Sequence, residues 1–161
     1  AWTPDGDHLV FSAPRDEGPP GLDLLALGTG ERRVLTTPGD GELLDAQPEV
    51  SPDGRLLAFT RWHAFGVGNV FVMPMSGGEP RQVTFDNLKI HGVSWEPDGE
   101  HLVFGSNRGG SFALWRVSIA GDAPRRVPIN GRAMDDPHVG RDGRRLAVAA
   151  EVLPDAPAQL R

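Results

Sequence analysis

We first examine Ser94, because its surroundings partly match a motif in which a serine, flanked by glycines two positions away on each side, is a catalytic nucleophile. The motif Gly-x-Ser-x-Gly lifts its serine on a strained turn between a strand and a helix. The stretch Gly92-Val93-Ser94-Trp95-Glu96 has the first glycine, but glutamate stands where the last glycine belongs. Its apolar pattern predicts a strand over 90–95 instead of a turn. We therefore interpret Ser94 as an ordinary strand serine and expect no catalytic residue.

The sequence also contains no convincing phosphate-binding loop or metal-binding motif. A phosphate-binding Gly-x-Gly-x-x-Gly loop opens a helix, whereas Gly66-Val67-Gly68-Asn69-Val70-Phe71 ends in phenylalanine and precedes no helical pattern. The histidines stand at 8, 63, 91, 101 and 138, and no close pair has the spacing of metal ligands. The sequence predicts no metal site and no cofactor.

One short pattern recurs along the chain, most completely as Trp95-Glu96-Pro97-Asp98-Gly99 before an apolar run. Its aspartates stand at 5, 53, 98 and 142, so the spacings are 48, 45 and 44 residues. In Pro-Asp-Gly, proline presets φ, aspartate bonds its own backbone and glycine accepts the left-handed conformation. The four aspartates are therefore explained by hairpin turns and need no catalytic or calcium-binding role.

Repeats of this length that hold several short strands are typical of propeller blades, each a four-stranded sheet. Closed propellers need roughly 4–8 blades, and this chain holds about three and a half repeats. The sequence predicts an all-β fold, a partial β-propeller of four-stranded antiparallel blades. We expect one incomplete propeller over 1–161, with repeats at 1–44, 45–89, 90–133 and 134–161.

Two details of the blades follow from the same pattern. In the second repeat, strands at 56–61 and 69–73 are expected to flank a glycine-bearing loop at 62–68. The aromatic side chains tied to the repeat are expected to pack between blades; these are Trp2, Phe11, Phe59, Phe71, Trp95, Phe104 and Trp115.

The residues that open the innermost strands are the best candidates for binding. In a propeller they lie at the mouth of the central channel, and ligands favour such concave places. Aligned on the turn aspartates, these positions differ between repeats where the structural positions recur, as a recognition surface requires. An unconstrained rim would show the same variation. We select Asp45, Gln47, His91, Asp135 and Asp136 as candidate ligand-binding residues.

The repeat resembles a known family. The run Val93-Ser94-Trp95-Glu96-Pro97-Asp98-Gly99, followed by Leu102-Val103-Phe104, Ser106-Asn107-Arg108-Gly109-Gly110 and Leu114-Trp115-Arg116-Val117, is similar to the WD40-like (PD40) repeat of TolB-type propellers. The resemblance spans nearly the whole chain and implies the propeller fold. It implies little about function, because one fold hosts many functions.

A longer run looks like the propeller part of a bacterial winged-helix regulator of the CadC-like type. The run is Thr84-Phe85-Asp86-Asn87-Leu88-Lys89-Ile90-His91-Gly92-Val93-Ser94-Trp95, continuing to Phe112-Ala113-Leu114-Trp115-Arg116. In such regulators the propeller is an extracytoplasmic sensor, so the resemblance implies a periplasmic location.

Composition limits the partners. The formal net charge is -6, with 22 acidic and 16 basic residues. Nucleic-acid binding needs a concentrated basic face, and here the basic residues are scattered through the repeats. No run of 18 apolar residues predicts a membrane span. We therefore expect no nucleic acid and no membrane span in this segment.

These observations together predict a non-catalytic binding or sensing propeller whose channel mouth binds a protein partner or a small ligand. The alternative is an accessory gating propeller of a prolyl-oligopeptidase-like serine peptidase, which a Gly-x-Ser-x-Gly motif in a carboxy-terminal extension would reveal. Self-assembly is a third interpretation, because two copies of three and a half blades would complete a ring of seven.

Overall fold

The computed structural model describes residues 1–129, 134–140 and 142–150. Within these ranges the secondary structure consists of β-strands and turns, and no residue lies in a helix. The strands are β1 (His8–Ala13), β2 (Gly21–Ala26), β3 (Arg32–Val34), β4 (Leu44–Val50), β5 (Leu56–Ala64), β6 (Val67–Pro74), β7 (Arg81–Gln82), β8 (Leu88–Trp95), β9 (His101–Ser106), β10 (Ala113–Ser118), β11 (Arg125–Arg126), β12 (Met134–Val139) and β13 (Leu146–Ala150). None of the described residues belongs to a helix that could cross a membrane.

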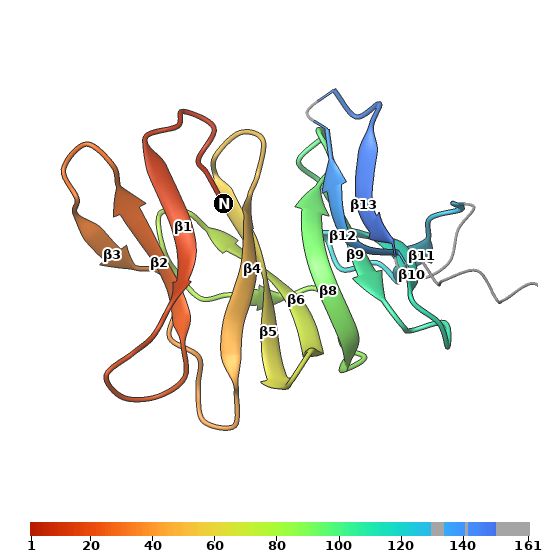
Figure 1. Cartoon of the computed structure of the whole chain (residues 1–161), viewed down its shortest axis with the longest axis horizontal. Coiled ribbons are helices and arrows are strands. Elements are labelled where there is room, and N and C mark those ends of the chain that lie inside the picture. Colours follow the sequence, from red (N-terminus) through yellow and green to blue (C-terminus); the bar gives the residue numbers. More distant parts are fainter. Residues whose placement is uncertain (130–133, 141, 151–161) are drawn as a thin grey trace, which may run out of the picture.

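Consecutive strands pair antiparallel and form blades. The first described blade is β1-β2-β3, the second β4 to β7, the third β8 to β11, and the fourth contributes β12 and β13. Figure 1 shows these sheets side by side, with the first blade at the left and the strands of the third and fourth blades at the right. The predicted fold class, an all-β partial propeller of antiparallel blades, is confirmed.

The Pro-Asp-Gly turns are built as the residue types require. Oδ1 of Asp53 accepts hydrogen bonds from the hydroxyl of Ser51 at 2.6 Å and from the backbone N–H of Arg55 at 3.0 Å. Gly54 closes this turn with a φ of 74°. These hydrogen bonds lower the pKa of Asp53 below its ordinary value, and the bond from the Ser51 hydroxyl has the largest effect. The equivalent carboxylates accept backbone N–H groups in the same way, so the four aspartates are structural.

Two cores lie between neighbouring blades. One joins the second blade to the third around Trp95 and Phe104, and the other joins the first to the second around Phe59. The predicted packing role is confirmed for these three residues, which are buried. It is wrong for Trp2, which is 61% exposed because none of the described sheets covers it.

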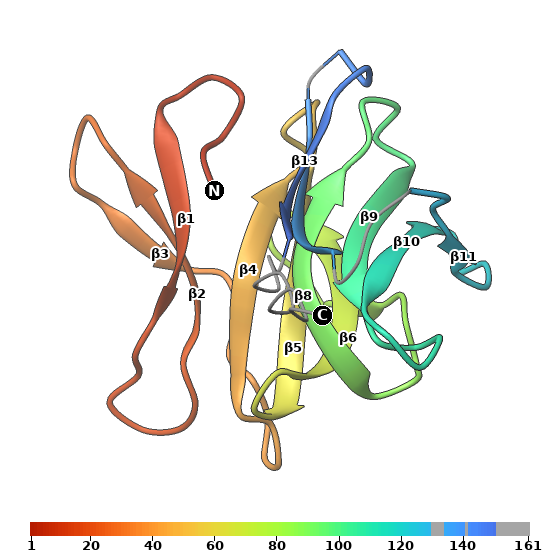
Figure 2. The same ribbon diagram turned by 45° about the vertical axis from the view of Figure 1, so that its right-hand side comes forward.

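The predicted loop at 62–68 is a tight hairpin. β5 continues to Ala64 and β6 begins at Val67, so only Phe65 and Gly66 form the turn. The strands approach closely because Gly68 has no side chain: a Cβ there would lie 2.1 Å from the carbonyl oxygen of Arg61. This hairpin carries the second blade to the end of the molecule where β4 and β8 begin, the lower end in Figure 2.

Candidate functional site

Each inner strand has a β-bulge close to its start. The register against the neighbouring strand shifts between Ala46 and Glu49 in β4, between His91 and Val93 in β8 and between Asp135 and His138 in β12. A bulge leaves an extra residue unpaired and changes the direction of its side chain. The backbone φ is positive at the bulge, 51° at Gln47, 61° at Gly92 and 42° at Asp136.

This bulge recurs at one position of the repeat. Gln47, Gly92 and Asp136 each stand six residues before the turn aspartate of their blade. Left-handed backbone is uncommon outside glycine, yet two of the three positions hold a polar residue. The blades therefore present different side chains from one shared backbone distortion.

Asp45 lies inside a bidentate ion pair. Its side chain is fully buried, and its two oxygens accept hydrogen bonds from Nε and Nη2 of Arg61 at 2.7 and 2.9 Å. The Asp45 carboxylate, more than any other group, raises the pKa of the Arg61 guanidinium above its ordinary value. The structure thus places Asp45 where it holds β4 against β5.

Gln47 is tied to β5 through a threonine. The hydroxyl oxygen of Thr60 lies 3.1 Å from Oε1 of Gln47 and 3.1 Å from the carbonyl oxygen of Ala46. The same hydroxyl accepts a hydrogen bond from the indole Nε1 of Trp62 at 3.0 Å. This network fixes the half-buried Gln47 side chain beside the Trp62 ring.

An exposed aromatic side chain stands on the β5–β6 turn. Phe65 is 86% exposed, and its ring meets the edge of Trp62 with 5.8 Å between centroids. A Cβ on the neighbouring Gly66 would lie 3.5 Å from Nε2 of His91, so the turn reaches the start of β8. The His91 ring packs in turn on Phe112, with 5.2 Å between centroids.

Asp136 lies against the bulge of the third blade. A Cβ on Gly92 would come within 2.6 Å of the Asp136 Cα and 2.9 Å of its Oδ1, so only glycine fits there. His91 and Asp136 each have interaction partners in the protein. Asp135 belongs to β12, but its side chain lies outside the part of the chain that the structure describes.

These contacts link residues from three blades into one group, which we call the bulge surface. It consists of Gln47, Trp62, Phe65, His91, Phe112 and Asp136. The sequence indicated the three polar members. It missed the aromatic ones because Trp62 and Phe65 fall in a stretch that reads as a loop. Two large aromatic residues in a short glycine-bearing loop were the available signal.

Ser94 has a structural role. It lies in β8 with 1% of its surface exposed, and its hydroxyl oxygen accepts a hydrogen bond from the backbone N–H of Val139 at 3.0 Å. This contact ties the third blade to the fourth. The interpretation as a strand serine is confirmed.

Glu96, Asp98 and His101 bring their ligand atoms within 4.8 Å of one another, as a metal site would require. The guanidinium of Arg116 already pairs with this group, at 2.8 and 2.9 Å from the Glu96 oxygens. Nδ1 of His101 lies 2.7 Å from Oδ2 of Asp98. The cluster is therefore satisfied by an arginine cation.

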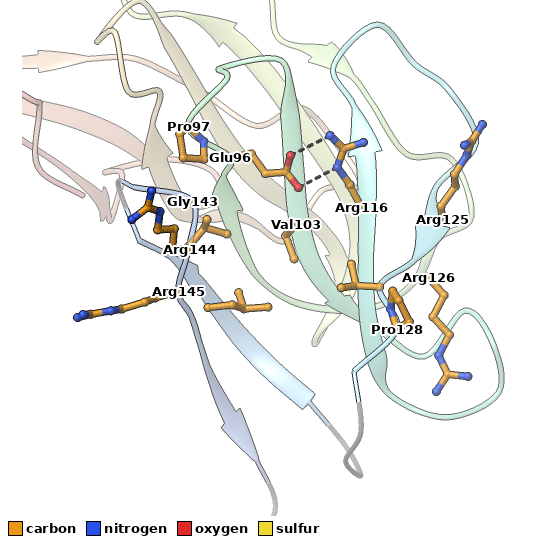
Figure 3. A pocket seen from close by; sticks show the side chains of 13 residues that line it. Glu96, Pro97, Val103, Arg116, Arg125, Arg126, Pro128, Gly143, Arg144 and Arg145 are labelled. Carbon is orange, nitrogen blue, oxygen red and sulfur yellow. Dashed lines mark hydrogen bonds and ion pairs between the residues drawn. The ribbon is translucent and has the colours of Figure 1, made fainter.

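A cavity of about 380 Å³ lies beside this cluster, between the third and fourth blades. Its walls include Val103, Val139 and Leu146. Figure 3 shows Arg116 turned toward Glu96, while four other arginines extend away from the cavity in different directions; these are Arg125, Arg126, Arg144 and Arg145. Because the cations do not converge, the cavity is a groove between blades and not an anion site.

Comparisons with known proteins agree with this architecture. The TolB from Acinetobacter baumannii has a solved structure that superposes with a TM-score of 0.78 at 27% identity, covering 91% of this chain and 36% of that chain. An uncharacterized protein of Agrobacterium fabrum is 28% identical over 89% of this chain and 47% of its own length. A protein of Streptomyces coelicolor named as a tricorn protease homolog is 31% identical over 95% of this chain and 13% of its own length. The chain thus spans about half, or less, of the length of these relatives.

The family model described as the TolB beta propeller domain (PD40) matches residues 1–153. That range includes all the described strands, the recurring Pro-Asp-Gly turns and the bulged inner strands. The chain belongs to the TolB β-propeller domain family.

Proposed function

We propose that this chain is a non-catalytic binding module that recognises a protein or a small ligand on its bulge surface. The observation that carries the proposal is the position of Phe65, which is 86% exposed among other aromatic and polar side chains. A single exposed apolar residue is ordinary, but a continuous patch marks interaction sites. Aromatic side chains are also enriched at protein interfaces.

The surface rests on a rigid support. The Asp45–Arg61 ion pair and the Thr60 hydroxyl fix the backbone and side chains behind it. A surface ordered before binding loses less conformational freedom on association, which favours affinity. The three candidate residues Gln47, His91 and Asp136 would supply polar contacts around the aromatic centre.

The binding role can be tested with a phage-displayed library of random peptides selected against the intact protein. Dissociation constants of the selected peptides are then measured by calorimetry for the Phe65→Ala variant. The matched control is Leu27→Ala, because Leu27 is 44% exposed and lies at the opposite end of its blade, where its N–H donates to the carbonyl oxygen of Asp7.

We expect Phe65→Ala to weaken binding about fivefold or more, the usual effect of losing a central interface residue. Leu27→Ala should leave the dissociation constant unchanged. Failure to select any binder, or peptides that respond to Leu27 and ignore Phe65, would contradict the proposal.

The second candidate function is that of an accessory propeller in a serine peptidase. It is favoured by one observation, the 31% identity to the tricorn protease homolog over 95% of this chain. The intact protein can be treated with a fluorophosphonate probe, which labels activated serines. The probe is applied to this chain together with any sequence that adjoins it in its gene, because an accessory propeller has no nucleophile of its own. Covalent labelling would establish the peptidase alternative, and an unlabelled protein would support the binding module.

A further inference from the structure

A cavity of about 600 Å³ lies at the other end of the inner strands, away from the bulge surface. Four successive repeats contribute to its wall, the first through residues 1–4 and the other three through the ends of β4, β8 and β12 and the residues that follow. The lining residues are Ala1, Trp2, Pro4, Glu49, Val50, Ser51, Pro52, Trp95, Pro97, His138, Val139 and Gly140. The cavity therefore lies where the inner strands of the described blades converge.

Two titratable side chains line this cavity from one position of the repeat. Glu49, Ser94 and His138 each stand four residues before the turn aspartate of their blade. Ser94 is buried, and its hydroxyl oxygen accepts a hydrogen bond from the backbone N–H of Val139. Glu49 and His138 line the cavity instead, and within the described ranges neither side chain has a hydrogen bond or an ion pair.

Most of the remaining wall is apolar or aromatic, with Ser51 and the α-amino group of Ala1 as further polar groups. Two indole rings and three prolines contribute, and no lysine or arginine from the described part of the chain lines the cavity. The Trp95 ring is fixed in place because its Nε1 donates to the carbonyl oxygen of Glu49 at 2.9 Å. Burial raises the pKa of Glu49 above its ordinary value, while the nearby His138 and the α-amino group of Ala1 act in the opposite direction.

We propose that this cavity binds an organic cation, a primary ammonium group on an apolar stem. The ammonium donates to the Glu49 carboxylate, and the stem packs on Trp2, Trp95 and the prolines. A carboxylate in a partly dry site gains from a hydrogen-bonded cation, and indole faces attract cations as well.

Other ligand classes fit less well. An anion would meet the Glu49 carboxylate, and among the described residues no arginine or lysine lines the wall to pair with such an anion; the groups that face Glu49 are His138 and the α-amino group of Ala1. A divalent metal ion needs several oxygen or nitrogen ligands, and of the residues that the structure describes Glu49 alone contributes a carboxylate to the wall. This site is separate from the bulge surface, so the two proposals are tested with substitutions of different residues.

The test uses phenethylammonium chloride as the probe and the neutral 2-phenylethanol as its matched analogue. Both are titrated into the intact protein by calorimetry, and the Trp95 indole N–H is followed by NMR. The key variant is Glu49→Gln, which keeps the shape and removes the charge. Glu79→Gln, at an exposed position outside the cavity, is the control.

We expect saturable binding of phenethylammonium that shifts the Trp95 indole signal. Glu49→Gln should weaken the binding of phenethylammonium about tenfold or more, the effect of losing a hydrogen bond to a charged group. Phenylethanol should bind the unsubstituted protein at least about tenfold more weakly than phenethylammonium does. Trp2→Ala, on the exposed part of the wall, should weaken binding severalfold. Equal affinity for the alcohol, equal affinity in Glu49→Gln, or no saturable binding would overturn the proposal.

Discussion

The indole Nε1 of Trp95 donates a hydrogen bond of 2.9 Å to the main-chain carbonyl oxygen of Glu49, and so joins the third blade to the second. Trp95 is 4% exposed and belongs to the core between these blades. One side chain thus contributes both apolar burial and a directed bond across the gap between two sheets.

Trp95→Phe should therefore lower the free energy of unfolding. The lost hydrogen bond contributes about 1 kcal/mol, and the smaller ring leaves an unfilled space that adds to the loss. Urea denaturation of the two proteins measures the difference. Trp2→Phe is the control, because Trp2 is 61% exposed and its substitution should change stability by less than about 0.5 kcal/mol. An equal loss of unfolding free energy in both variants would contradict a specific stabilising role for the Trp95 contact between the blades.

Glu49→Gln should stabilise the protein at neutral pH and have little effect in acid. Burial raises the pKa of Glu49, so the folded protein resists ionisation of this carboxyl more than the unfolded chain does. Below the ordinary carboxyl pKa, Glu49 is protonated in both the folded and the unfolded protein, and its ionisation does not lower the stability. As pH rises through the elevated pKa of the folded state, stability is lost.

Thermal melting at pH 4 and pH 7 tests this expectation. The gain in melting temperature of Glu49→Gln over the unsubstituted protein should appear at pH 7 and nearly vanish at pH 4. A gain of the same size at both values would mean that ionisation of Glu49 is not its cause. A binding residue that lowers stability is a familiar compromise between stability and function.

Asp45→Asn should be strongly destabilising. The substitution leaves the Arg61 guanidinium, 15% exposed, without its buried carboxylate partner. Breaking a buried pair on one side costs roughly 3–5 kcal/mol, and the remaining contact of Arg61 with Glu42 at 2.7 Å should keep the loss near the lower limit. Chemical denaturation gives the value. Asp40→Asn removes the same charge at an exposed position and should be neutral; a similar loss in that control would argue against a specific ion-pair effect.

Gly92→Ala should disturb the contact between the third and fourth blades. The φ of 61° at Gly92 disfavours any side chain, and a Cβ would lie 2.6 Å from the Cα of Asp136. We expect a loss of more than about 1 kcal/mol and faster amide exchange in β12. Gly28→Ala is the matched control, since a Cβ there meets nothing within 4 Å. Unchanged exchange in β12 would contradict the account of this contact.

The sequence predicted the blades well because their turns are local. Pro52-Asp53-Gly54 and its equivalents carry their hydrogen-bonding pattern within a few residues, so residue type alone indicates the hairpin. The bulges were not predictable in this way. Gln47, Gly92 and Asp136 share a backbone conformation but no chemical type.

The candidate site was only partly predictable for the same reason. The pairing of Asp45 with Arg61 depends on the register of β4 against β5, which no local pattern reveals. Gly66, next to Phe65, lies near His91 only because the hairpin is tight enough to bring the turn to the start of β8.

The most direct test of the binding surface is the footprint of a selected peptide on the intact protein, measured by amide hydrogen exchange. We expect slowed exchange in the peptide complex at 45–47, 62–66, 90–92 and around Phe112. Slowed exchange confined to the opposite end, around Pro52 and Pro97, would contradict the assignment of recognition to the bulge surface.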